Sequence, residues 1–240
     1  MRYIAFLLLM GLTACGEIVL VQPAPRPAPV ETQRVTPTPV PTRPSVPAQA
    51  FLQVVDDMLP VAINECRART RGVRCDYAIV VDDRPGIPPN AFQTLGPDGQ
   101  PVVGFTLALI RDAANSDELA FVLGHEAAHH IAGHISRGQA SAQTGAILAG
   151  AVAALGGGDE VAIERAQNIG AFYGGRRYSK EFELEADALG AILTMRAGYD
   201  PIRGVAFFEN APDPGNRFLG THPPNADRIR VVREVVARQR

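Results

Sequence analysis

Two histidines and a glutamate in the middle of the chain have a spacing that can do chemistry. His125 and His129 are four residues apart, and Glu126 directly follows the first histidine. On a helix, positions i and i+4 lie one above the other, so both imidazoles could bind one metal ion. Glu126 would then lie beside the metal, where it could take a proton from an attacking water. The pattern predicts half of a zinc site for hydrolysis.

The residues before this motif indicate that it lies on a helix. Asn115 suits an N-cap position and Glu118 follows three residues later, as in a capping box. Leu119, Val122 and Leu123 then share one face at helical spacing. We expect a buried helix, and we favour it over a chance match in which the histidines are only core residues.

A zinc site of this kind needs a third protein ligand. A metzincin would have a histidine ten positions after His125, but Ile135 is there. A gluzincin takes a glutamate from a separate helix, and residues 179–190 are acid-rich and helical in character. Glu183 is the candidate ligand, and Asp187 on the same face could accept the ring proton of a ligand histidine. The alternative is a solvated acidic first turn.

The two motifs together resemble those of a known family. They are similar to the zinc metallopeptidases that include HtpX, the CAAX prenyl protease and the periplasmic proteases BepA and LoiP. The resemblance covers roughly residues 50–240, and further segments agree with it, namely Asn90-Ala91-Phe92 and Thr221-His222-Pro223, with Arg228 six positions after the histidine.

The resemblance implies a gluzincin metalloendopeptidase with one zinc ion per chain. Its ligands would be His125, His129 and Glu183, and Glu126 would be the catalytic base. The implied substrates are polypeptides, in particular unfolded or misassembled envelope proteins.

Two residues near the end of the chain have more than one interpretation. His222 could donate a hydrogen bond to the oxyanion, could occupy the fourth zinc position and keep the enzyme latent, or could have no role. Arg228 could pair with Asp187, with a substrate carboxylate or with water alone. We include His222 among the candidate catalytic residues, and Asp187 and Arg228 among those that support the zinc ligands. His130 and His134 form a second i, i+4 pair about 100° around the helix from the ligands. We expect them to support the ligands or to lie at the surface rather than to form a second metal site, and we leave them out of the catalytic residues.

The family places an edge strand beside the zinc helix. Here residues 100–106 follow a Gly96-Pro97-Asp98-Gly99 turn after residues 91–95, so we expect a hairpin with 100–106 at the edge. The edge could bind an extended substrate by strand addition, or it could be protected as in an ordinary hairpin.

The first 48 residues predict export and tethering. An apolar run over 4–10 follows Arg2 and precedes Leu12-Thr13-Ala14-Cys15, which resembles a bacterial lipobox. We expect a signal peptide over 1–14, a lipid on Cys15, and a proline-rich linker over 15–48. Gly16 favours the periplasmic face of the outer membrane, whereas a plain cleaved signal is the alternative.

The remaining residues, 49–240, suit one domain. Helix is expected over 50–70 and a strand over 77–82, followed by the hairpin, the zinc helix and mainly helices, the last over 227–239. The fold class predicted is α+β, a mainly helical zincin-type domain with a small sheet. The net charge of −2 offers no basic surface for nucleic acid.

Three further segments carry expectations. Cys66 and Cys75 are nine residues apart, and export favours a disulfide between them over two free thiols. Residues 144–155 are apolar but too short to cross a bilayer, which leaves a buried helix or a mobile flap hinged at 156–158. Residues 174–177 predict a solvated loop.

The function predicted is a zinc-dependent endopeptidase in quality control of the bacterial envelope. The alternative is a lipid-tethered assembly or chaperone-like factor that keeps a latent zinc site. The intact Glu126 argues against the alternative.

Overall fold

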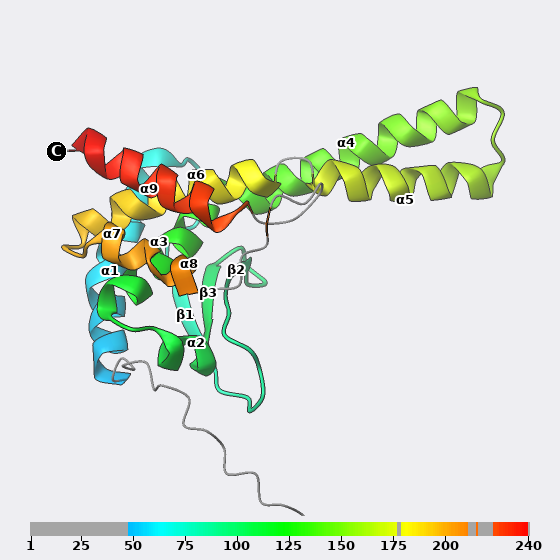
Figure 1. Cartoon of the computed structure of the whole chain (residues 1–240). Helices are drawn as coiled ribbons and strands as arrows, with labels where there is room; N and C mark the ends of the chain where they lie inside the picture. The colour runs from blue at the N-terminus through cyan, green and yellow to red at the C-terminus, as the bar shows by residue number, and fades with distance from the viewer. Residues whose placement is uncertain (1–47, 177–178, 211–214, 216–222, 240) are drawn as a thin grey trace, which may run out of the picture. The chain divides into compact units, whose positions relative to one another are not determined.

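The computed structural model describes residues 48–176, 179–210, 215 and 223–239. Cys15, the expected signal peptide and nearly all of the linker lie outside the described residues, as does His222. The elements of the described residues are α1 (Ala48–Arg69), β1 (Ala78–Asp82), β2 (Ala91–Leu95), β3 (Pro101–Thr106), α2 (Leu107–Asp112), α3 (Ser116–Ile131), α4 (His134–Leu155), α5 (Glu160–Arg176), α6 (Ser179–Arg196), α7 (Pro201–Val205), α8 (Phe207–Asn210) and α9 (Asn225–Gln239) (Figure 1). The predicted α+β class with mainly helices is confirmed.

The small sheet has the order β1-β3-β2. Strand β3 pairs in parallel with β1 and antiparallel with β2. The expectation that residues 100–106 form the edge was therefore wrong. These residues form β3, which pairs with β2 on one side and with β1 on the other and so lies in the middle of the sheet. The edge strand that contacts the motif helix α3 is β2.

Helix α3 begins as its sequence predicts. The Asn115 side chain accepts a hydrogen bond from the Glu118 backbone N–H at 3.1 Å, and the Glu118 carboxylate accepts one from the Ala114 N–H at 2.9 Å. Nearly the whole helix is buried, because α1, α6, α7 and the sheet all pack against it. Leu119, Leu123 and their neighbours lie in the main core, so the motif that follows is held on a rigid element.

Helices α3 and α6 cross with their backbones almost in contact. A methyl group added at Gly190 would lie 2.8 Å from the His125 backbone nitrogen, and one added at Gly124 would lie 2.8 Å from the Gly190 carbonyl oxygen. Only glycine permits this approach. The crossing lies beside His125, and Glu183 and Asp187 share a helix face with Gly190, so the approach brings both acidic residues towards the histidine.

The stretch between the two motifs forms a helical hairpin of α4 and α5, which lie side by side (Figure 1). Residues 144–155 belong to α4, but the expected burial of this segment was wrong, since Ile147, Leu148, Val152 and Leu155 are exposed. The loop expected over 174–177 was also wrong, because 174–176 continue α5. Gly174 is needed there, since a methyl group on it would lie 2.3 Å from the Ser141 carbonyl oxygen of α4.

Two further expectations concern export and the membrane. Cys66, near the end of α1, forms a disulfide with Cys75, just before β1. Among the described helices, none combines the length and the apolar character that crossing a membrane would require.

Candidate active site

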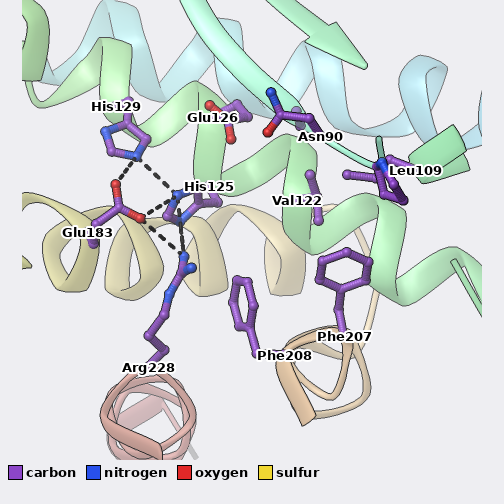
Figure 2. Close-up of a pocket in the computed structure, with 12 residues that line it drawn as sticks. Asn90, Leu109, Val122, His125, Glu126, His129, Glu183, Phe207, Phe208 and Arg228 are labelled. Atoms are coloured by element: carbon purple, nitrogen blue, oxygen red, sulfur yellow. Dashed lines mark hydrogen bonds and ion pairs between the residues drawn. The ribbon is translucent and has the colours of Figure 1, made fainter. Parts of the chain in front are cut away.

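The three predicted metal ligands meet at one point. The Nε2 atoms of His125 and His129 are 3.0 Å apart, and carboxylate oxygens of Glu183 lie 3.6 Å from the first and 3.4 Å from the second (Figure 2). Ligand atoms about 2.1 Å from a tetrahedral zinc ion are roughly 3.3 Å from one another. Two imidazole nitrogens and a carboxylate oxygen at these separations form a donor set that fits zinc.

His125 is held by a buried ion pair. Its Nδ1 lies 2.9 Å from Asp187 Oδ1, which leaves Nε2 free to face the other two ligands. Arg228 of α9 donates to both carboxylate oxygens of Asp187 at 2.7 Å, and its guanidinium carbon lies 3.7 Å from the centre of the Phe208 ring. Asp187 is fully buried, so the charge of Arg228 compensates for that of a carboxylate that water cannot reach.

The charges in the site favour a cation. Burial lowers the pKa of His125, but Asp187 and then Glu183 raise it, to about 10. The same carboxylates would attract a metal ion at this place. Burial by itself would raise the pKa of Asp187, but its hydrogen bonds with Arg228 and His125 keep that pKa below the usual value. Asp187 is therefore an anion that can orient its histidine partner.

Glu126 lies in the wall of a pocket next to the three candidate ligands. The other lining residues are Pro89, Asn90, Ala91, Leu109, Val122, Phe207, Phe208 and Arg228 (Figure 2). Burial raises the pKa of Glu126 above its usual value, whereas the two motif histidines lower it. A carboxylate with a raised pKa is a better base for a proton of water. A second hollow, lined by Gln93, Ile135 and His134, shares Glu126 and His129 with the first.

One residue of the site was not in the predicted set. His134 lies with its Nδ1 2.8 Å from His129 Nδ1, and burial is the main cause that lowers the pKa of His134, to about 4. Its ring is thus neutral near pH 7. The spacing from His129 gave no signal, because five residues on one uninterrupted helix do not share a face. The only signal in the sequence is the glycine at 133, because glycine can end a helix. In the structure Gly133 has a φ of +66° and separates α3 from α4.

The remaining predicted residues divide into two groups. The structure brings together His125, Glu126, His129, Glu183, Asp187 and Arg228. His130 points elsewhere, since its Nε2 lies 2.7 Å from the carbonyl oxygen of Arg74. His222 and Cys15 lie outside the described residues, so their roles stay predictions.

Comparison with known proteins gives the family. The model of peptidase family M48 matches residues 54–236, which include every site residue described above. The chain belongs to peptidase family M48. The predicted family and the predicted metallopeptidase class are thereby confirmed.

Relatives of this M48 chain include proteins from mitochondria and from a bacterium. It is 30% identical over 135 residues to the mitochondrial metalloendopeptidase OMA1 of Arabidopsis thaliana, covering 55% of this chain and 27% of that protein. It is 28% identical over 171 residues to OMA1 of Saccharomyces cerevisiae, covering 66% and 46%. A putative beta-barrel assembly-enhancing protease of Vibrio cholerae is 32% identical over 160 residues, covering 60% and 32%. The chain thus spans less than half the length of these relatives.

Proposed function

We propose that this chain is a zinc-dependent endopeptidase that cleaves unfolded or misassembled proteins of the bacterial envelope. The single observation that supports this most is the meeting of His125, His129 and Glu183, with Glu126 in the wall of the adjoining pocket. Membership of family M48 and relatives named as metalloendopeptidases support the same reaction.

The chain's own residues have defined tasks in this reaction. Zinc, when bound by His125, His129 and Glu183, would supply a Lewis acid that polarises the scissile carbonyl and acidifies the attacking water. Glu126 takes the proton of that water and passes it to the leaving nitrogen. Asp187 fixes the tautomer of His125 through the hydrogen bond at Nδ1. Arg228 keeps Asp187 ionised and in place.

The edge strand β2 offers a way to hold an extended substrate. The pocket at Asn90 and Ala91 and the hollow at Gln93 both include Glu126 and His129. A peptide paired with the edge of β2 would therefore pass the base and the ligands. Backbone pairing of this kind does not depend on side chains, so it suits unfolded chains. The apolar walls formed by Leu109, Val122 and Phe207 would favour an apolar side chain on one side of the scissile bond.

The proposed location is the periplasmic face of the outer membrane. The apolar run over 4–10 and the lipobox-like residues before Cys15 support export and lipidation, with the proline-rich linker as a spacer. The bacterial relative is named for beta-barrel assembly, which agrees with this compartment.

The test is metal content and cleavage of casein by the full-length chain, with Glu126→Gln as the matched variant. The expected result is one zinc per chain in both proteins, with activity lowered about 10²–10⁴-fold in the variant. Equal cleavage by both proteins would overturn the assignment of Glu126, and absence of bound zinc in the wild type would overturn the site.

The second candidate function is a client-binding assembly factor with a latent zinc site. The exposed apolar residues of the α4–α5 hairpin favour it, because such surfaces bind other molecules. A Glu126→Gln chain that fully replaces the wild type in a deletion strain would support this function over proteolysis.

A further inference from the structure

The break between α3 and α4 places a second histidine against a zinc ligand. Residues five apart on one helix differ by about 140° in direction. Gly133 interrupts the helix with a left-handed conformation, φ +66° and ψ +33°, and His134 starts α4. The ring of His134 returns towards α3 as a result, and its Nδ1 lies 2.8 Å from His129 Nδ1.

The hydrogen atoms along this contact can be assigned. His129 directs Nε2 to His125 and Glu183, so its Nδ1 carries the proton when Nε2 binds a metal. That N–H must donate to His134 Nδ1, which therefore has no proton. With Nδ1 unprotonated, the ring of His134 carries its proton on Nε2, which lies 3.2 Å from Glu185 Oε2, an acceptor. Arg137 donates to the same oxygen at 2.8 Å. Each donor in this series of hydrogen bonds, from His129 through His134 to Glu185, therefore has an acceptor.

The orientation of the His134 ring is fixed by an aromatic ring stacked on its face. Phe182 stacks on it, with ring centres 4.5 Å apart and planes 10° apart, and only 5% of His134 is exposed. The guanidinium carbon of Arg137 lies 4.4 Å from the centre of the same Phe182 ring. Phe182 directly precedes the ligand Glu183, so one turn of α6 supplies a metal ligand and the residue that orients His134.

We propose that His134 is a positioning residue for His129, which it holds in the tautomer and ring plane that direct Nε2 to the metal. The inference rests on the proposed zinc site. Each ligand histidine then has its own partner at Nδ1. The partner of His125 is the charged Asp187, and the partner of His129 is the neutral His134. Loss of such a partner weakens metal binding about 10–100-fold in other zinc sites.

The test measures zinc affinity of the full-length chain by competition with a chelator. His134→Phe keeps a ring for Phe182 to stack on but removes both hydrogen bonds, and we expect zinc affinity to fall about 10–100-fold. His134→Asn offers an amide oxygen near the position of Nδ1 and is expected to recover most of the loss. The matched control is His130→Phe. His130 is also buried, but its ring nitrogen contacts the Arg74 carbonyl oxygen and not His129. It should bind zinc like the wild type.

Two results would overturn the proposal. One is wild-type zinc affinity in His134→Phe, and the other is an equal loss in His130→Phe, which would mean a general loss of packing. A wild-type chain that binds no zinc would instead contradict the proposed function itself, and the inference with it.

A second measurement needs no variant. Nitrogen-15 NMR of the histidine rings in the zinc-loaded wild type should show His129 protonated at Nδ1 and His134 neutral and protonated at Nε2. A His134 ring with its proton on Nδ1, or with protons on both nitrogens, would contradict the proposal even if His134→Phe failed to fold.

Discussion

The α3–α6 crossing and the α4–α5 hairpin both have close glycine contacts between helices, but they differ in which side chains they bury. The crossing encloses charged side chains, whereas the hairpin leaves large apolar ones exposed. At the crossing, Gly124 and Gly190 bring two helices together around buried charged groups. In the hairpin, Gly145 and Gly170 do the same, since a methyl group on either would lie 2.1–2.2 Å from the other's carbonyl oxygen. There the large apolar side chains of α4 face outwards.

The difference shows that close helix packing can orient buried charged groups in one region and simply join two helices in another. Among the described residues no buried side-chain nitrogen or oxygen lacks a hydrogen-bond partner, so the charges at the crossing are oriented as well as enclosed. In the hairpin the helices approach at glycines, with the Gln167 side chain of α5 lying against Gly150 of α4. The exposed apolar residues of α4 contribute little to packing within the hairpin, and among the described residues they remain available to other molecules.

The largest effect expected is loss of the buried charge at the crossing. Asp187→Asn should lower the free energy of unfolding by about 3–5 kcal/mol, because buried Arg228 loses the carboxylate that binds it at 2.7 Å and keeps only Glu183, at 3.6 Å, as an ion-pair partner. Urea unfolding of the zinc-free protein measures it. The double variant Asp187→Asn/Arg228→Met should recover part of the loss, and a double variant as unstable as the single one would contradict this explanation.

The next effect compares one leucine from each region. Leu123→Ala should lower the free energy of unfolding by about 2–5 kcal/mol, since Leu123 is fully buried. Leu148→Ala in the hairpin should change it by less than about 0.5 kcal/mol, since Leu148 is 62% exposed. Denaturant midpoints of the two variants give the comparison. A large loss for Leu148→Ala would show that another part of the chain covers the hairpin.

Smaller effects than that of Leu123→Ala are expected at two glycines, with opposite signs. Gly190→Ala should cost about 1–3 kcal/mol, because the methyl group meets the His125 backbone. Gly138→Ala on α4 should stabilise by about 0.5–1 kcal/mol, because nothing lies within 4 Å of the added methyl group and alanine favours a helix. Thermal unfolding measures both, and the same sign at both positions would remove the contrast between the regions.

The sequence was most informative where local rules apply. The i, i+4 pair His125 and His129 and the cap at Asn115 depend only on helix geometry, so the motif helix was predicted with its start. Glu183 could be selected because a gluzincin takes its third ligand from a separate helix and because Glu183 and Asp187 share one face of the acid-rich helix that follows. Each of these features belongs to a single helix.

It was least informative where the result depends on contacts between distant segments. Pairing of β3 with β1 cannot be read from either strand, so 100–106 was placed at the edge. Apolar residues on α4 suggested burial, since that is their usual place, and the glycines near 174 suggested a loop rather than a close helix contact. The contact of His134 with His129 could not be predicted, because it depends on the conformation of Gly133, which glycine permits but does not require.

The hairpin also has a consequence for folding kinetics, because in the sequence it lies between the two halves of the proposed metal site. His129 and Glu183 are far apart in sequence, and an open loop of that length would slow the search of α6 for α3. When α4 and α5 close on each other from the turn at 156–158, the ends of the loop arrive together. Folding of the hairpin thus shortens the effective loop between α3 and α6. Glu183, the candidate ligand on α6, then comes near His125 and His129 once α4 and α5 have paired.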